Sequence, residues 1–248
     1  MHTFLNQIIA AKGYTSYLEI GVDDPKNTFN HIQCERKAGV DPYNDDTGCH
    51  AWDRANKEAL IARIDRKATF YRYTSDDFFA TMHEEHKRHV FPLLTADHFD
   101  LIYIDGLHFD LIYIDGLHLE AQVDKDIENA LRFVSPHGMI VLDDVPPANE
   151  YEEKTPPDPG QPWRGTVWRS FAKLRMESDD MFWEFNKHGL YTIKSIFKSI
   201  ILPHRQHTPV YKNADFPEPV LSFEFLKAYE DELLNNISQD EFFKIISE

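Results

Sequence analysis

Residues 98–117 read HFDLIYIDGLHFDLIYIDGL, the same ten residues written twice in tandem, and His118 follows. Each copy contains the apolar run Leu-Ile-Tyr-Ile and then Asp-Gly. A short run of β-branched and aromatic residues that ends in turn residues is typical of a buried parallel strand. Because parallel strands carry ligand-binding groups at their carboxyl ends, Asp105 or Asp115 is predicted to lie at a site.

The sequence after the second copy indicates a strand–helix–strand unit. Residues 119–134 place apolar side chains at helical spacing, and a proline and a glycine separate them from the buried run MIVLDDV. We therefore predict a helix and then a strand over Gly138–Asp144. This strand ends in the acidic pair Asp143 and Asp144, at the same edge of the sheet as the acid of the repeat.

Only one copy of the repeat can be the central strand. Neighbouring parallel strands need a crossover of roughly a dozen residues or more, and only DGLHFD separates the two LIYI runs. If the first copy were the strand, the second would have to loop out at the mouth of the site. We therefore predict that Leu111–Asp115 forms the buried strand, with Asp105 displaced. The surplus copy is expected to stay looped out, pair with another chain or drive a swapped dimer.

The composition is that of an acidic globular protein. Its 248 residues, 42% hydrophobic and 27% charged, suffice for one α/β domain with a full core. The net charge of -16 argues against nucleic acid and anionic membranes as partners, because Lys and Arg drive the binding of phosphate groups. Cys34 and Cys49 supply no disulfide framework, and no apolar stretch approaches the ~20 residues of a membrane span. Without a recognisable signal peptide, a cytoplasmic location is expected.

The amino-terminal part indicates a βαβ unit. A short amphipathic helix over residues 3–12 precedes a strand over Ser16–Val22. Asp24 is a plausible N-cap with Pro25 in the first helical position, so we predict a helix that ends near Gln33. A second strand, KAGVDPY, follows this helix.

The acids of this unit are spaced as in nucleotide-binding sites. The second strand ends at Asp41, and the spacing from Glu19 to Asp41 places an acid where it can accept hydrogen bonds from both ribose hydroxyls. Glu19, Gly21 and Asp41 are therefore candidate cofactor-binding residues.

The loop after the first strand discriminates between nucleotides. It has one glycine, Gly21, followed by Asp23 and Asp24. A dinucleotide site needs several glycines and a helix start without negative charge, because pyrophosphate binds backbone N–H groups there. The two acids repel pyrophosphate but tolerate S-adenosylmethionine, which has positive sulfonium and amino groups and no phosphate. Alone the loop also suits an ordinary strand–turn–helix connection; joined to Asp41 it favours S-adenosylmethionine.

A third strand is expected over residues 68–73, after a helix over 54–66. In this architecture the end of the third strand lies beside the adenine, so Ser75 and Asp76 are candidate base contacts. The alternative is that either residue only caps the next helix.

The carboxyl-terminal part begins with residues 146–162, whose prolines and acids indicate a mobile loop. A helix over 163–177 follows, and the segments 181–185 and 189–195 make an antiparallel hairpin at the edge of the sheet. The end of the chain contains amphipathic helical segments that suit docking on the domain or on a partner chain.

The sequences of several segments resemble those of one enzyme family. YLEIGV, GVDPY, IDGLH, LDDV and GTVWRSF are similar to motifs of class I S-adenosylmethionine-dependent methyltransferases, within them a group that includes macrocin-type and other macrolide and sugar O-methyltransferases. The resemblance covers roughly residues 3–196. It implies an α/β, Rossmann-like, mostly parallel seven-stranded sheet with an antiparallel edge hairpin and helices on both faces. We accordingly expect a methyltransferase-like domain over 1–196 and a helical C-terminal extension over 197–248.

The resemblance also implies a metal site. In catechol-type O-methyltransferases, one acid after the fourth strand and two adjacent acidic or amide residues after the fifth hold magnesium; the matching positions here are Asp115, Asp143 and Asp144. Mg²⁺ or another divalent cation takes oxygen ligands and lowers the pKa of a bound hydroxyl. Asp115 and His118 are the expected catalytic residues, with His118 a fourth ligand or the general base. The alternative is that adjacent acids after a strand only cap the next segment or face water.

Trp163, Arg164 and Trp168 are expected over the same crevice. Arg164 suits a substrate contact if the methyl acceptor carries a carboxylate. Trp163 can cover the acceptor, although tryptophans at helical spacing are more often core residues.

The expected function is metal-assisted O-methylation of a small-molecule hydroxyl. Two other interpretations stay open. One is a metal-dependent enzyme on this fold that transfers no methyl group, such as a hydroxylase; the other is a non-catalytic assembly protein. The displaced repeat copy and the C-terminal helices are the candidate surfaces for a homodimer.

Overall fold

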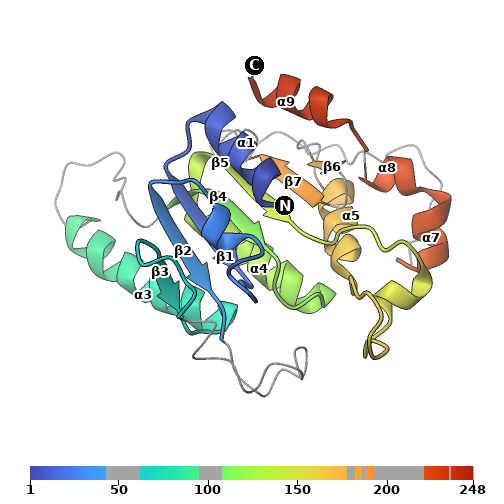
Figure 1. Cartoon of the computed structure of the whole chain (residues 1–248), viewed down its shortest axis with the longest axis horizontal. Coiled ribbons are helices and arrows are strands. Elements are labelled where there is room, and N and C mark those ends of the chain that lie inside the picture. Colours follow the sequence, from blue (N-terminus) through green and yellow to red (C-terminus); the bar gives the residue numbers. More distant parts are fainter. Residues whose placement is uncertain are drawn as a thin grey trace.

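The structure is a computed structural model that describes residues 1–42, 62–94, 108–177, 182–185, 188–192, 221–234 and 236–247. At its centre lies a sheet with the strand order β3-β2-β1-β4-β5-β7-β6 (Figure 1). The strands are β1 (Ser16–Ile20), β2 (Arg36–Val40), β3 (Thr69–Tyr71), β4 (Phe109–Ile114), β5 (Val134–Leu142), β6 (Phe182–Phe185) and β7 (His188–Thr192). β1 to β5 pair in parallel, whereas β7 runs antiparallel to both β5 and β6. A mostly parallel sheet with an antiparallel edge hairpin is therefore present.

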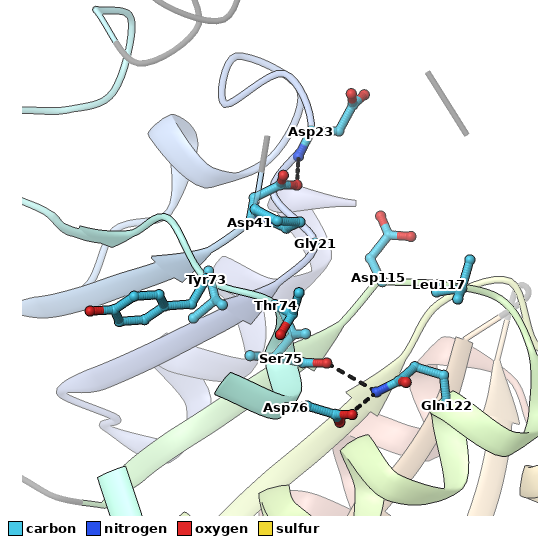
Figure 2. A pocket seen from close by; sticks show the side chains of 14 residues that line it. Gly21, Asp23, Asp41, Tyr73, Thr74, Ser75, Asp76, Asp115, Leu117 and Gln122 are labelled. Carbon is cyan, nitrogen blue, oxygen red and sulfur yellow. Dashed lines mark hydrogen bonds between the residues drawn. The ribbon is translucent and has the colours of Figure 1, made fainter. Parts of the chain in front are cut away.

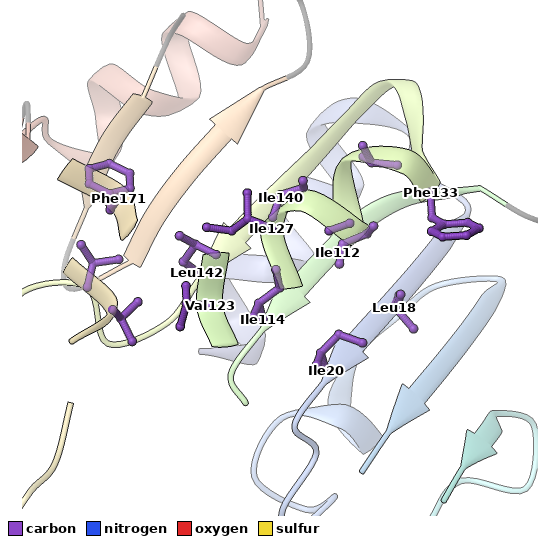
Figure 3. Close-up of a cluster of buried hydrophobic side chains, with 14 of the residues drawn as sticks. Leu18, Ile20, Ile112, Ile114, Val123, Ile127, Phe133, Ile140, Leu142 and Phe171 are labelled. Atoms are coloured by element: carbon purple, nitrogen blue, oxygen red, sulfur yellow. The ribbon is translucent and has the colours of Figure 1, made fainter. Parts of the chain in front are cut away.

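Alternating side chains of the central strands bury a core on each face of the sheet. On β1, Leu18 and Ile20 belong to the larger core and Tyr17 belongs to the other. The larger core is covered by α3 (Ser75–Leu94), α4 (Glu120–Phe133) and α5 (Val167–Glu177), and the other by α1 (His2–Lys12). Figure 3 shows the larger core, where Ile112 and Ile114 of β4 lie in one cluster with side chains of α4. Helices thus cover both faces.

β4 is built from the second copy of the repeat. It lies between β1 and β5, with Leu111 opposite Tyr17 on one side and Met139 on the other. A strand in this position has both edges paired, so the other copy cannot join the sheet beside it. The prediction that the second copy forms the buried strand is confirmed, and β4 ends immediately before Asp115. The first copy, including Asp105, lies outside the described residues.

The prediction of a helix over residues 25–33 is wrong. Only the short 3₁₀ helix η1 (Phe29–His31) forms there, after a series of turns. Asp24 does start the first turn, since its carboxylate accepts a hydrogen bond from the N–H of Lys26 at 3.1 Å. The buried ammonium of Lys37, however, donates to the carbonyls of residues 29, 30 and 32 at 3.2, 3.4 and 3.3 Å. A buried charge requires such partners, and they come from a segment held out of the α-helical conformation.

Other boundaries also differ from the predictions. β5 begins at Val134, directly after α4, rather than at Gly138. α5 begins at Val167 rather than at residue 163, because the N–H groups of Arg164 and Gly165 donate to the carbonyl of Glu152 and that of Thr166 to the carbonyl of His118. The helix predicted over 54–66 lies mostly outside the described residues, and residues 62–66 form turns and bends.

The helices near the carboxyl end pack on the α/β unit of the same chain. They are α7 (Phe223–Ala228), α8 (Glu230–Leu234) and α9 (Gln239–Ser247). Phe242 of α9 lies against Phe4 of α1, with ring centroids 5.6 Å apart, and Lys12 donates to the carbonyl of Ile246 at 3.0 Å. In the described part of the chain, no helix combines the length and the apolar character that crossing a bilayer requires.

Candidate active site

A pocket of about 280 Å³ opens where β1, β2 and β4 end and α3 begins (Figure 2). Separate parts of the chain meet there because parallel strands end at one edge of the sheet. The structure brings together candidates that are far apart in the sequence. The lining residues are Ile20, Gly21, Asp23, Val40, Asp41, Pro42, Tyr73, Thr74, Ser75, Asp76, Asp115, Gly116, Leu117 and Gln122.

Gly21 lies where the end of β1 approaches the end of β4. Its φ is 85°, and a Cβ at this position would lie 2.0 Å from the carbonyl oxygen of Asp115. The N–H of Asp115 donates to the carbonyl of Ile20 at 2.8 Å, so the two strand ends are hydrogen-bonded. Glycine is needed here for both its conformation and its lack of a side chain.

Asp41 and Glu19 have different surroundings. Asp41 lines the pocket, and its Oδ2 accepts a hydrogen bond from the N–H of Asp23 at 3.1 Å. Glu19 is 1% exposed, accepts from the hydroxyl of Tyr17 at 2.5 Å and is not one of the lining residues. Burial raises the pKa of Glu19 well above its ordinary value. Its side chain is a buried partner of Tyr17, so this geometry does not support the expected contact between Glu19 and a cofactor.

Thr74, rather than Ser75 or Asp76, caps α3. Its Oγ1 accepts from the N–H of Asp77 at 3.1 Å and donates to the Asp77 carboxylate at 2.8 Å. Ser75 and Asp76 line the pocket together with Gln122, whose Nε2 donates to Ser75 Oγ at 3.1 Å and to Asp76 Oδ1 at 3.0 Å (Figure 2). Gln122 was missed from the sequence because only the packing of α4 beside α3 brings it here.

His118 and the acids after β4 and β5 form a group that shares Asp115 with the pocket. His118 Nε2 lies 3.2 Å from Asp115 Oδ1, and its Nδ1 lies 3.8 Å from Asp144 Oδ2. One potential ligand atom from each of these three residues lies within 4.8 Å of the others. Asp143 has other partners: it accepts from the hydroxyl of Tyr113 and from the N–H of Asp144, the latter at 2.9 Å. The geometry thus groups His118, rather than Asp143, with Asp115 and Asp144.

Burial and mutual charge set the pKa values in this group. Burial, and then the charge of Asp143, raises the pKa of Asp144 to about 6. Burial also raises the pKa of Asp115, against the hydrogen bond with His118. For His118, burial lowers the pKa, but the hydrogen bond with Asp115 and the nearby carboxylate charges outweigh burial and raise it. Carboxyls with raised pKa values mark a place where a cation would be stabilised.

Arg164 is engaged by other groups of the protein. Its Nε lies 3.0 Å from Glu152 Oε2 and 3.7 Å from Asp144 Oδ1, and its guanidinium donates to the carbonyl of Pro146. Its side chain is 12% exposed. Arg164 therefore joins the loop after β5 to the acid group, and in this arrangement it does not present its charge to a substrate carboxylate.

The two tryptophans have separate roles. Trp163 stacks on the imidazole of His118 with ring centroids 5.4 Å apart, and its carbonyl oxygen lies 3.3 Å from His118 Nδ1. Its indole N–H donates to the carbonyl of Lys154 at 3.0 Å. Trp168 is completely buried in the larger core, as the alternative for the tryptophans predicted. Trp163 is therefore the one that borders the acid group.

Residues 165 and 166 hold the segment after β4. The N–H of Thr166 donates to the carbonyl of His118 at 2.8 Å, and its Oγ1 accepts from the N–H of Glu120 at 2.7 Å. Thr166 thus binds an N–H group in the first turn of α4 from outside that helix. The sequence indicated these residues only as part of the motif GTVWRSF, since their partners are distant in the chain.

Comparison with known proteins agrees with this arrangement. A family model described as a methyltransferase domain matches residues 107–145, which include β4, Asp115, His118 and the pair Asp143 and Asp144. The chain resembles the S-adenosylmethionine-dependent methyltransferases. No curated protein is similar enough to count as a match.

Several solved methyltransferases are similar to this chain at low sequence identity. An O-methyltransferase from Bacillus cereus in complex with SAH is 17% identical, with a TM-score of 0.47, over 77% of this chain and 80% of that one. TomG from Streptomyces achromogenes is 15% identical, with a TM-score of 0.45, over 76% and 78%. MycE of the mycinamycin pathway, in complex with Mg and SAH, is 13% identical, with a TM-score of 0.45, over 76% and 47%. Because fold does not determine function, the function must be argued from the site.

Proposed function

We propose that this protein transfers a methyl group from S-adenosylmethionine to a hydroxyl of a small molecule, with the help of a divalent cation. The observation that carries the proposal is the position of Asp115, which lines the pocket and also belongs to the group with His118 and Asp144. A ligand in the pocket and a hydroxyl at the acid group would meet at this residue.

The pocket suits this cofactor. S-adenosylmethionine supplies a methyl group on a positively charged sulfur. The lining includes Asp23, Asp41, Asp76 and Asp115, and an acidic lining favours a cation and opposes a pyrophosphate. Asp41 follows β2, which pairs in parallel with β1, and this is the position from which an acid accepts hydrogen bonds from ribose hydroxyls.

The acid group fits a hard divalent cation. Oxygens of Asp115 and Asp144 and a nitrogen of His118 lie within 4.8 Å of one another, and carboxylate oxygens are preferred ligands of Mg²⁺. The raised pKa values of both carboxyls reflect burial and repulsion that a cation would relieve. A divalent cation held by Asp115 and Asp144 would lower the pKa of an acceptor hydroxyl. Asp143 supports this arrangement through its hydrogen bond with the N–H of Asp144.

In this proposal His118 takes the proton of the acceptor hydroxyl. Trp163 O lies 3.3 Å from its Nδ1 and Asp115 Oδ1 lies 3.2 Å from its Nε2. Both neighbours accept hydrogen bonds, which favours the imidazolium form and agrees with the raised pKa. His118 therefore serves as a base above its raised pKa, while Trp163 covers one face of the ring.

Calorimetric titration with S-adenosylhomocysteine tests the cofactor part of the proposal. The wild type should bind, and Asp41→Ala should weaken binding by roughly tenfold or more, because the ribose hydroxyls lose a charged acceptor. Asp158→Ala, outside the pocket, is the matched control and should bind like the wild type. No binding by the wild type would overturn the proposal.

Titration with Mg²⁺ tests the metal part without an activity measurement. The wild type should give a binding heat that Asp144→Ala abolishes and Asp158→Ala retains. Binding of S-adenosylhomocysteine without any binding of Mg²⁺ would support the methyltransferase activity and contradict the role of a metal ion in it.

A further inference from the structure

Gln122 offers one amide nitrogen to three acceptor groups. Its Nε2 lies 3.1 Å from Ser75 Oγ, 3.0 Å from Asp76 Oδ1 and 3.1 Å from Asp126 Oδ1. Figure 2 shows this nitrogen directed at Ser75 and Asp76. If the amide were turned over, its oxygen would face two carboxyl groups, which is unfavourable. The surroundings therefore determine which end of the amide faces the acids.

The two carboxyl groups are themselves held in place. Asp76 Oδ2 pairs with Lys125 at 3.1 Å, and the hydrogen bond from Gln122, with this pair, lowers the pKa of Asp76 and keeps it ionised. Asp126 is 1% exposed on α4, one helical turn after Gln122. The orientation of Gln122 is thus built into the protein and does not depend on a ligand.

With its nitrogen committed, Gln122 has its amide oxygen to offer to the pocket that it lines. No hydrogen bond to this oxygen occurs within the described residues. Two large apolar side chains of the same lining are exposed, Tyr73 at 43% and Leu117 at 36%, and offer apolar surface to a flat ring. The lining therefore combines apolar surface with a fixed acceptor.

We propose that Gln122 Oε1 accepts a hydrogen bond from the exocyclic amino group of the bound nucleoside and so makes the pocket specific for an amino-substituted base. A base with a carbonyl oxygen in that place would set two acceptors against each other, and the fixed amide cannot rotate to present its nitrogen. The inference rests on the proposed binding of S-adenosylmethionine and adds the residue that selects its base.

The experiment compares S-adenosylhomocysteine with its deaminated analogue, S-inosylhomocysteine, by calorimetric titration. The wild type should bind the adenosyl compound roughly 10- to 100-fold more tightly, the cost of an unpaired or opposed polar group. Gln122→Met keeps the length and helix propensity of the side chain, and should reduce this ratio to about threefold or less by weakening the adenosyl compound. Gln33→Met, at an exposed glutamine outside the pocket, should keep the wild-type ratio.

Gln122→Glu is the second variant, because it retains an acceptor oxygen if Gln122→Met folds poorly. It should still prefer the adenosyl compound. Equal ratios in the wild type and in Gln122→Met, or loss of the preference in Gln122→Glu when the variant is folded by circular dichroism, would overturn the inference while the cofactor proposal stands. Failure of the wild type to bind either compound would overturn both.

Discussion

Gly165 packs directly on the backbone of His118: a Cβ at Gly165 would lie 1.9 Å from the carbonyl oxygen of His118. Thr166 donates its N–H to the same oxygen at 2.8 Å. The position of the imidazole therefore depends on a segment that lies far along the chain and belongs to neither β4 nor α4.

Gly165→Ala should displace His118. The φ of 57° and the overlap with the carbonyl together cost about 2 to 4 kcal/mol in the free energy of unfolding, and a displacement near 1 Å reduces turnover by roughly 100-fold. Gly160→Ala is the control, since Gly160 has φ of 73° but nothing within 4 Å of its Cβ position, and should cost about 1 kcal/mol. Urea unfolding and a methyl-transfer assay measure the two effects. Similar losses in both variants would show that the contact with His118 is unimportant.

Gly21→Ala should separate the ends of β1 and β4. Its Cβ would lie 2.0 Å from the carbonyl oxygen of Asp115, so the affinity for S-adenosylhomocysteine should fall by roughly 100-fold. Gly13→Ala provides the same kind of backbone conformation, with φ of 65° and open space around the Cβ position. We expect Gly13→Ala to lower the unfolding free energy without changing affinity, as measured by calorimetry; a matching loss of affinity in it would contradict the role of Gly21.

Asp105 and Asp115 lie in identical local sequences, which makes them a matched pair. Asp115→Ala should abolish the heat of Mg²⁺ binding and lower the pKa of His118, because it removes the hydrogen bond and charge that raise this pKa. Asp105→Ala should leave both unchanged. Titration calorimetry and an NMR titration of the imidazole provide the measurements, and the reverse outcome would mean that the first copy forms the strand.

Removal of one repeat copy tests whether the surplus copy contributes to stability or to association. Deleting residues 98–107 and deleting 108–117 give the same chain, so a deletion cannot identify the copy in β4. Because the remaining copy can form the whole strand, the unfolding free energy should change by no more than about 1 kcal/mol. Size-exclusion chromatography of the same variant reports whether the surplus copy mediates association. A variant that does not fold would show that the surplus is part of the structure.

Asp126 should destabilise the fold at neutral pH. Burial raises its pKa from 3.8 to about 6, so between these values the folded state keeps a proton that the unfolded state has released. Stability therefore falls as pH rises through this window, by up to about 3 kcal/mol. Asp126→Asn should raise the unfolding free energy by about 1 to 2 kcal/mol at pH 7.5 and have little effect near pH 4. Equal effects at both pH values would exclude this origin.

Asp110 should show the opposite pH dependence. Hydrogen bonds from Thr15, Ser16 and Ser135 to its carboxylate outweigh the effect of burial and lower its pKa. Its contribution is present above an ordinary pKa of 3.8 and is lost as pH falls through the lowered value. Asp110→Asn should cost about 2 kcal/mol at pH 7 and less in strong acid, by urea unfolding. Asp100→Asn, in the other repeat copy, is the control and should have no effect.

Much of the sheet could be predicted because its determinants are local. An apolar run with β-branched and aromatic residues predicts a buried strand, and the acids after the runs that form β1, β2, β4 and β5 lie at one edge in any parallel sheet. Six residues cannot cross over between parallel strands, so only one repeat copy could be the central strand. The second copy was chosen because it would otherwise have to loop out at the mouth of the site.

The environment of each side chain was decided by the tertiary structure. Glu19 is in the expected motif, yet Tyr17 and burial remove it from the pocket. A predicted helix is replaced by turns because Lys37, from the next strand, binds the carbonyls there. Such outcomes depend on partners from other elements, which no local pattern contains.

The same division applies to the site. The convergence of Asp41, Asp115 and Asp144 could be predicted from the sequence, because the carboxyl ends of parallel strands lie at one edge of the sheet. The partners of other side chains depended on the tertiary structure: Asp143 accepts from Tyr113, Arg164 is bound to Glu152, and Gln122 lines the pocket. A strand end is positioned by the pattern of its own segment, whereas a hydrogen bond or the burial of a side chain requires two segments to meet.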